Sequence, residues 1–251
     1  MYKRQEHPRA LIDKLQYGPF ANDPLLGASR YELSWQNTTT RRGVYSFCMC
    51  PGGYVVSSST DHNGLVTNGM SYSRRNGLHS NSALIVSVRA GEDFDKNNPL
   101  SGFEFQKKIE RAASELSKAQ ASGKELPCMT VGEFLSGKIV SSEIRRNSSL
   151  SGAFKTDWRS LFPAFVNEHL REGLLAFDKN FPGFCAHDAL LFAPETRTSS
   201  PVTISRNPDT SESVSHKGLF PCGEGSGYAG GITSSAVDGV KAALSVLGVI
   251  E

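Results

Sequence analysis

The stretch Phe220-Pro-Cys-Gly-Glu-Gly-Ser-Gly-Tyr-Ala-Gly-Gly-Ile232 decides how the C-terminal part of this chain folds. It places five glycines and one glutamate between an apolar run, residues 218–222, and an amphipathic run, residues 232–247. The first run predicts a short buried strand, and the second predicts a helix with one apolar face. Glycines in such a turn let a ligand approach the backbone, and the free N–H groups and helix dipole favour negative charge. The stretch therefore predicts contact with a nucleotide-type cofactor.

The same turn contains the pattern of a dinucleotide-binding fingerprint. Gly225-Ser-Gly-Tyr-Ala-Gly230 matches G-x-G-x-x-G, and Glu251 follows at about the distance of 20 residues that the fingerprint requires. A Rossmann unit needs more parallel strands after that helix, and only three residues remain. Either the nucleotide domain is cut off here, or this is the closing strand–helix of a domain that begins elsewhere, which we favour. A turn without a ligand is the third interpretation, opposed by the entropic cost of so many glycines.

Composition narrows the class of protein. The chain has 251 residues, enough to bury a substantial core, and a formal net charge of +2. Scattered charges give no basic patch for nucleic acid. No apolar run approaches the roughly 18 residues of a membrane span. The odd number of cysteines favours a reducing compartment, the cytoplasm or a soluble organelle interior, over a disulfide framework; they are Cys48, Cys50, Cys128, Cys185 and Cys222.

The first five residues, Met1-Tyr-Lys-Arg-Gln5, look like the translation of an adapter used in preparing sequencing libraries. We therefore exclude residues 1–5 from the expected fold as an adapter-like artefact. On this interpretation Glu6 is not a natural start, and protein sequence precedes it.

The remaining sequence alternates strand-like and helical segments. Strands are predicted at residues 44–50, 54–57, 65–67, 82–88, 189–192 and 201–204. Helical spacing of apolar residues predicts helices at 100–120 and 163–177. Thr130-Val-Gly-Glu133 is a capping-box pattern that begins a short helix, and the serine-rich residues 137–156 are expected to form a surface loop. The predicted fold class is α+β, a mixed body of sheet and helices closed by one strand–helix of a parallel α/β domain.

Several short motifs, in this order along the chain, carry a family resemblance. They are Glu6-His-Pro8, Cys48-Met-Cys-Pro-Gly-Gly53, Asn68-Gly-Met-Ser71, Asn81-Ser-Ala83, Glu195-Thr-Arg-Thr-Ser-Ser-Pro201 and Gly223-Glu-Gly-Ser-Gly-Tyr-Ala-Gly-Gly231. Together they resemble the uncharacterised FAD-dependent dehydrogenases (oxidoreductases) of bacteria and plastids, from about residue 6 to the end of the chain.

The resemblance implies an arrangement of domains. In that family a Rossmann-type FAD half comes first, an inserted substrate domain follows, and the chain then returns to complete the flavin site. Residues 6–190 would be the inserted α+β substrate domain, and residues 191–251 the C-terminal FAD-binding segment with the closing strand–helix of the FAD/NAD(P)-binding domain. The N-terminal Rossmann half is lacking here, so it is an expected partner, together with a small-molecule substrate.

The resemblance also implies site residues. Glu224 would accept a hydrogen bond from a ribityl hydroxyl, and the N–H groups at the start of the last helix would face the pyrimidine edge of the flavin. Arg197 would lie near the flavin or the substrate pocket, where it could pair with an anionic group; a surface salt bridge is the alternative. The expected cofactor-binding residues are Gly223, Glu224, Gly225, Gly230, Gly231, Ile232 and Arg197.

Cys48 and Cys50 flank Met49 at strand spacing, which predicts that both thiols point to the same face of a sheet. They are the candidate catalytic residues, with one thiol over the flavin as a redox group or general acid. Two other interpretations stay open: buried small hydrophobic residues, and a metal pair, which lacks C-x-x-C or H-x-x-H partners.

The leading hypothesis is the substrate domain and flavin-completing segment of an FAD-dependent oxidoreductase. The first alternative is a non-enzymatic module that binds a nucleotide or a partner's acidic group through the glycine turn. The second is a cysteine-dependent hydrolase or transferase that uses Cys48 or Cys50, which requires a histidine within reach of the thiol.

Overall fold

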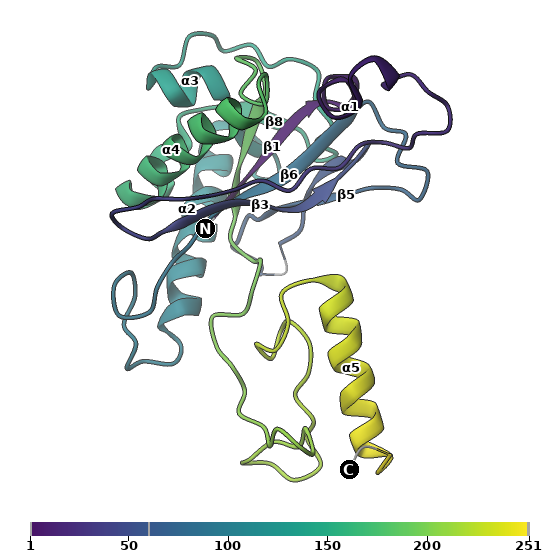
Figure 1. Ribbon diagram of the computed structural model, residues 1–251. Helices are drawn as coiled ribbons and strands as arrows, with labels where there is room; N and C mark the ends of the chain where they lie inside the picture. The colour runs from purple at the N-terminus through teal and green to yellow at the C-terminus, as the bar shows by residue number, and fades with distance from the viewer. Residues whose placement is uncertain (1, 60, 250–251) are drawn as a thin grey trace. The chain divides into compact units, whose positions relative to one another are not determined.

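The computed structural model describes residues 2–59 and 61–249 (Figure 1). The chain divides into two compact units. The first comprises residues 1–88 and 107–196, and the second residues 89–106 and 197–251. The sequence placed a boundary between residues 190 and 191, which falls at the first residue of a strand that belongs wholly to the first unit.

A seven-stranded sheet forms the centre of the first unit, in the order β2-β3-β6-β1-β9-β7-β8. Neighbouring strands are antiparallel except β7 and β8, which are parallel. The sheet is therefore mixed and mainly antiparallel. Its strands are β1 (Tyr2–Pro8), β2 (Ser34–Gln36), β3 (Gly43–Cys50), β6 (His79–Val86), β7 (Leu126–Thr130), β8 (Ala153–Lys155) and β9 (Leu190–Glu195).

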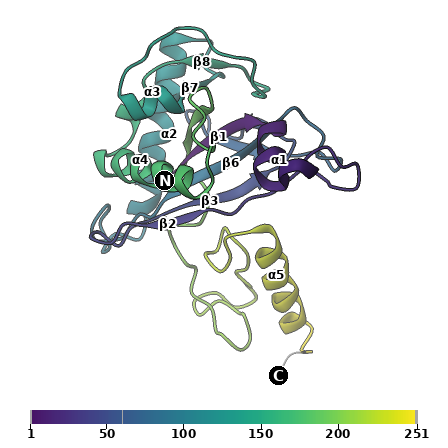
Figure 2. The ribbon, with the colours of Figure 1, turned by 45° about the horizontal axis from the view of Figure 1, so that its top comes forward.

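Helices cover one face of this sheet, where α4 (Ala164–Asn180) and α1 (Arg9–Tyr17) lie side by side in both ribbon views (Figures 1 and 2). Gly173 of α4 packs so closely on Val44 of β3 that a Cβ atom there would lie 2.5 Å from a Val44 methyl carbon. The hairpin of β4 (Tyr54–Ser57) and β5 (Thr67–Met70) packs on the opposite face together with α2 (Ser101–Gln120). The short helix α3 (Val131–Ser136) and two 3₁₀ turns, Gly18–Phe20 and Trp158–Leu161, complete the list of helical elements in this unit.

Strand β1 lies in the middle of the sheet although none of its residues after Tyr2 is apolar except Pro8. Lys3, Arg4, Gln5, Glu6 and His7 are all fully buried. The exclusion from the fold was therefore wrong for residues 2–5, and Met1 lies outside the described residues. Charged residues normally indicate solvent, but here each long side chain finds partners inside the protein, and an isolated sequence cannot show such partners.

Odd and even residues of β1 point to opposite faces of the sheet. On the helical face the Lys3 ammonium lies 3.8 Å from the ring centroid of Trp158 and 4.3 Å from that of Phe134, and it donates a hydrogen bond of 2.9 Å to Asn167 Oδ1. Burial lowers the pKa of Lys3. On the hairpin face Arg4 meets the carboxylate of Glu195.

The second unit contains one complete helix, α5 (Ile232–Val246), which was predicted at residues 232–247 and is confirmed. The strands predicted at 218–222 and 201–204 are wrong: among the described residues of this unit only isolated bridges occur, such as Arg206 with Ser213. No described strand lies beside these two segments, so their backbone groups form hydrogen bonds with side chains and within turns. For example, Pro221 O accepts a hydrogen bond of 2.7 Å from Arg206 Nη1. The predicted helix is thus present, whereas the strand predicted before it is not formed among the described residues.

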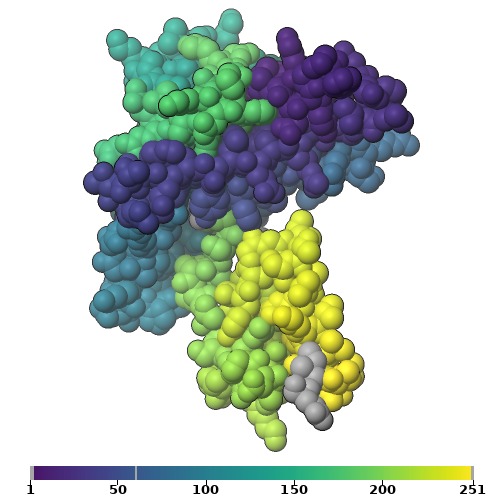
Figure 3. Space-filling model, in the orientation of Figure 1, coloured from purple at the N-terminus to yellow at the C-terminus, as the bar shows by residue number. Residues whose placement is uncertain are grey.

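Side chains of α5 form part of the visible surface (Figure 3). Ile232 is 86% exposed and Leu247 72% exposed, and Ala242 is the buried residue of the helix. The apolar face that the sequence predicted for this helix is therefore not covered by the second unit itself. Large exposed apolar surfaces commonly mark contact regions.

Candidate functional site

The glycine turn before α5 is held by its own backbone and by one carboxylate. Gly223 donates its N–H to Asp238 Oδ2 at 2.8 Å, and its carbonyl accepts the Tyr228 N–H at 3.1 Å. The N–H of Gly227 reaches Glu224 O at 3.0 Å. These bonds close the turn onto the second turn of α5, so its shape is defined without a ligand.

Two glycines of the turn are required by the fold. Gly223 and Gly227 have φ values of +75° and +85°, which side chains rarely adopt. A Cβ atom on Gly227 would also lie 2.3 Å from Val202 O. Gly225 and Gly230 differ: neither has a positive φ, and a Cβ atom at either position would meet nothing within 4 Å. The chain's own packing therefore does not explain these two glycines.

The start of α5 has an N-cap glycine, Gly231, with an extended backbone (φ −150°, ψ 167°). Its N–H donates to Ser234 Oγ at 3.1 Å, and its carbonyl accepts the Ser235 N–H at 2.9 Å. Glycine has no side chain to cap the first N–H groups of the helix. These groups and the helix dipole consequently favour an anionic or polar ligand at this end.

Glu224 lies within the turn and has an exposed side chain. Partial burial nevertheless raises the pKa of its carboxyl. The carboxylate is close to the open glycines in sequence, as expected for a residue that would hold a ligand hydroxyl.

Arg206 connects the turn to α5, a feature that sequence reasoning missed. Its guanidinium binds the two carboxylate oxygens of Asp238 at 2.6 and 3.0 Å and lies 3.6 Å from the ring centroid of Tyr228. The same Asp238 accepts the Gly223 N–H. The pair thus fixes one end of the turn relative to the helix. The sequence offers one signal: Asp238 is the single acidic residue of α5, whose other residues, apart from Lys241, are apolar or small.

In the first unit, a buried polar cluster surrounds Arg4. Its Nε lies 2.8 Å from Glu195 Oε2 and its Nη2 2.5 Å from Glu195 Oε1, with both side chains at most 3% exposed. Arg4 Nη1 donates to Asn81 Oδ1 at 2.8 Å, and Nη2 to Asn68 Oδ1 at 3.3 Å. Asn81 Nδ2 is buried without a hydrogen-bond partner. The cluster brings together β1, β5, β6 and β9, and its Asn68 and Asn81 belong to motifs that carry the family resemblance.

The two candidate catalytic cysteines lie at the edge of this cluster. The strand alternation predicted for them is wrong, because β3 has an irregular register between Phe47 and Cys50, and Cys48 has a left-handed backbone with φ +45°. Cys48 is exposed and Cys50 is buried. The Cys50 thiol nevertheless donates to the backbone carbonyl of Cys48 at 3.5 Å. Arg4 Nη1 lies 3.2 Å from Cys48 O and 3.8 Å from Cys50 Sγ.

The electrostatics of the two thiols differ. The neighbouring Cys50 side chain, together with the positive charge of Arg4, lowers the pKa of Cys48 to about 6. The neighbouring Cys48 side chain and burial raise the pKa of Cys50. A thiolate near neutral pH is a nucleophile, and such cysteines occupy electropositive, partly exposed environments. Cys48 has those properties and Cys50 does not.

A family model described as "FAD-dependent protein, C-terminal domain-like" matches residues 2–198. The chain belongs to this family. The match begins inside β1, so residues 2–5, which the sequence interpretation had set aside, are part of the family domain. It ends before the glycine turn, so the turn lies outside the matched residues.

An uncharacterised protein of Clostridium beijerinckii is also similar to this member of the FAD-dependent C-terminal family. The two are 42% identical over 246 residues, which is 97% of this chain and 45% of that protein. The chain therefore spans less than half the length of this relative. The similarity includes the glycine turn and α5 because it covers nearly the whole chain.

The predicted site residues are distributed over both units. The glycines, Glu224 and Ile232 belong to the second unit, whereas Cys48 and Cys50 belong to the first. Arg197 is partly buried and is the first residue after the first unit. None of the described helices is both long and apolar enough to cross a membrane.

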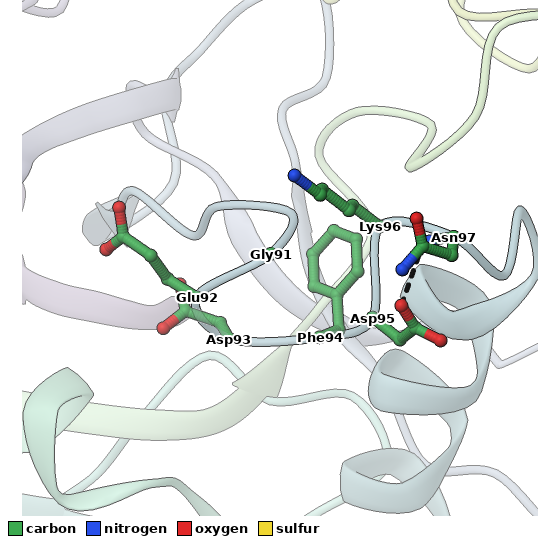
Figure 4. Close-up of a pocket in the computed structure, with 7 residues that line it drawn as sticks. All are labelled: Gly91, Glu92, Asp93, Phe94, Asp95, Lys96 and Asn97. Carbon is green, nitrogen blue, oxygen red and sulfur yellow. Dashed lines mark hydrogen bonds between the residues drawn. The ribbon is translucent and has the colours of Figure 1, made fainter.

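A pocket in the second unit was not predicted (Figure 4). A single loop lines it, and the loop is held by local bonds such as Asn97 N–H to Asp95 Oδ1 at 2.9 Å. The lining residues are Gly91, Glu92, Asp93, Phe94, Asp95, Lys96 and Asn97. The pocket is therefore formed by one segment of the chain.

Proposed function

We propose that this chain is the C-terminal part of an FAD-dependent oxidoreductase, in which the turn at residues 223–232 completes the flavin site and the first unit serves as the substrate domain. The observation that carries the proposal is the pair of glycines at 225 and 230, where neither backbone angle nor packing requires glycine. At these two positions a Cβ atom would fit, but none is present. The open space lets a ligand approach the backbone.

The residues of the turn fit a flavin nucleotide. The N–H group of Ile232, at the first residue of α5, suits the polar pyrimidine edge, and Glu224 can accept a hydrogen bond from a ribityl hydroxyl. Bound FAD would supply two-electron redox chemistry, which no side chain of the turn can supply. The family description names FAD dependence and agrees with this assignment.

The open side of α5 supports a further part of the proposal, a nucleotide-binding half that covers it. Val237 and Val240 are 50% and 59% exposed, and an apolar helix face of this kind favours a packed neighbour. The Clostridium relative has more than half of its length outside the region that matches this chain. We assign the covering half to that region.

In the substrate domain, the exposed Cys48 is the proposed redox or acid–base thiol. A small-molecule substrate would meet its sulfur, and the unpartnered Asn81 Nδ2 is a donor available in the same cluster. Arg4 holds the Cys48 carbonyl and thereby the position of the thiol.

The test is a chimera in which this chain replaces the matching part of the Clostridium relative. We expect it to purify yellow with about one FAD per chain, as for a cofactor held by an enzyme of this type. Gly230→Ala and Glu224→Ala should lower FAD occupancy without changing the melting temperature of the FAD-free protein. Glu115→Ala, an exposed residue of α2, is the matched control. A colourless chimera, together with a colourless relative, would sink the proposal.

A further inference from the structure

Two cysteines and one arginine form an arrangement of which the flavin proposal uses only Cys48. Cys48 and Cys50 come from one irregular segment of β3, and the Cys50 thiol donates to the Cys48 carbonyl at 3.5 Å. The positive φ of Cys48 turns its residue out of the strand alternation. This turn leaves one thiol exposed and the other, two residues along the chain, buried. A regular strand would carry both on one face at a spacing set by the pleat.

The guanidinium of Arg4 holds both members of this pair. It donates to the Cys48 carbonyl at 3.2 Å and lies 3.8 Å from Cys50 Sγ. Its position is fixed by Glu195, Asn81 and Asn68. A buried cation next to two thiols stabilises the negative charge that develops on sulfur during thiol–disulfide exchange. The charged groups that face the pair are Arg4 and Glu195.

We propose that Cys48 and Cys50 constitute a thiol–disulfide exchange centre, in which Cys48 attacks a small disulfide substrate and Cys50 resolves the adduct. The assignment rests on exposure: Cys48 is open to solvent, and Cys50 is buried against Arg4 and against Cys48. The exchange reaction needs no flavin, so it and the binding of FAD by the glycine turn can fail independently.

The reaction has two steps. The Cys48 thiolate attacks one sulfur of the substrate R–S–S–R, which forms Cys48–S–S–R and releases RS⁻. Cys50 then loses its proton to solvent, and its sulfur attacks the sulfur of Cys48, which forms the Cys48–Cys50 disulfide and releases the second RS⁻. The substrate disulfide is reduced to two thiolates, and the cysteine pair is oxidised by the same two electrons.

The experiment uses the full chain with Cys185→Ser and Cys222→Ser, since Cys222 is exposed and Cys185 is partly buried. Dithiobisnitrobenzoate is the substrate probe. We expect two coloured thiolates for each reagent molecule consumed and a protein mass lower by two hydrogen atoms, without an adduct. Cys50→Ser should release one thiolate and keep the adduct. Cys48→Ser should react more than about tenfold slower. A stable adduct on the parent, or equal rates for the parent and Cys48→Ser, overturns the proposal.

The second measurement is the pH dependence of alkylation by iodoacetamide. It follows the ionisation of the Cys48 thiol and requires no disulfide exchange. The midpoint at Cys48 should lie well below the ordinary value of about 8.5 for a thiol. Cys50→Ala removes the hydrogen-bond donor and should raise the midpoint, whereas Cys50→Ser keeps a hydroxyl donor and should raise it less. A midpoint at the ordinary value that no variant changes contradicts the assignment. Circular dichroism of each variant shows that the fold is retained.

Discussion

The buried pair of Arg4 and Glu195 gives a direct test of how the centre of the sheet is stabilised. Arg4→Met removes the guanidinium and leaves the Glu195 carboxylate fully buried without its cation. Glu195→Leu removes the carboxylate instead and leaves the Arg4 guanidinium buried without its anion. Arg4→Met/Glu195→Leu removes both charges and replaces them with apolar groups of similar length.

The expected magnitude follows from the geometry. Both side chains are at most 3% exposed, and two charge-assisted hydrogen bonds of 2.8 and 2.5 Å join them. Removing one partner of such a pair costs about 3–5 kcal/mol of unfolding free energy, because an uncompensated charge stays buried. Arg4 also donates to Asn81 Oδ1, so Arg4→Met should fall at the upper end of this range.

The double variant should recover much of the loss, since replacing a buried ion pair by apolar residues is often close to neutral. The coupling between the two sites should therefore exceed about 2 kcal/mol. The unfolding free energy that the double variant does not recover reflects the hydrogen bonds that Arg4 no longer donates to Asn81 Oδ1 and to the Cys48 carbonyl.

Urea unfolding of all three variants, followed by tryptophan fluorescence, measures this cycle. Trp158 is fully buried in the first unit and reports its unfolding. Arg9→Met removes a partly exposed cation that faces Asp13 at 3.3 Å and is the matched control, with an expected loss below about 1 kcal/mol. Equal losses for Arg4→Met and Arg9→Met, or strict additivity in the double variant, would refute the reasoning.

Three more predictions concern single positions. Burial lowers the pKa of His7 to about 3 from an ordinary value of 6.5, so below about pH 6.5 the unfolded chain binds a proton that the folded chain does not. The free energy of unfolding should therefore fall by about 2 kcal/mol from about pH 7 to about pH 5. His7→Leu should remove this part of the pH dependence in urea unfolding curves. Gly227→Ala should lower the melting temperature of the second unit, in contrast to Gly230→Ala, because its Cβ would meet Val202 O at 2.3 Å in a left-handed backbone; equal melting temperatures would contradict this. Thr130→Ala should cost about 1 kcal/mol, since its hydroxyl accepts the Glu133 N–H at 3.1 Å, whereas Thr130→Ser should cost much less.

Local patterns in the sequence were sufficient to predict those elements whose structure depends mainly on neighbouring residues. The capping box at Thr130 and Glu133 is confirmed, with both reciprocal bonds present. The long helices α2 and α4 and strands β3, β4 and β9 are confirmed near their expected bounds, because their apolar residues recur at the period of the element. The predicted loop at 137–156 missed the short strand β8, which has no such pattern and forms by pairing with β7.

The Arg4 cluster could not be predicted for a different reason. Arg4 and Glu195 are 191 positions apart, and nothing in the local sequence of either residue shows that they meet. The thiol pair was noticed by its spacing, but the geometry inferred from it was wrong. An irregular register between Phe47 and Cys50 breaks the alternation on which the inference depended.

The polar strand β1 raises the question of how a strand without apolar alternation keeps its register. A shift of one residue exchanges the two faces of a strand. In β1 that shift would bring Lys3 toward the hairpin face, where Cys50 and Asn81 lie, and Arg4 among the rings of Phe134 and Trp158, away from its carboxylate. Each cation would lose its own partners and be left buried, at a cost of several kcal/mol. Buried charge can therefore specify the register that apolar alternation specifies in other sheets, and the polar residues that hid β1 in the sequence are the ones that fix its position in the fold.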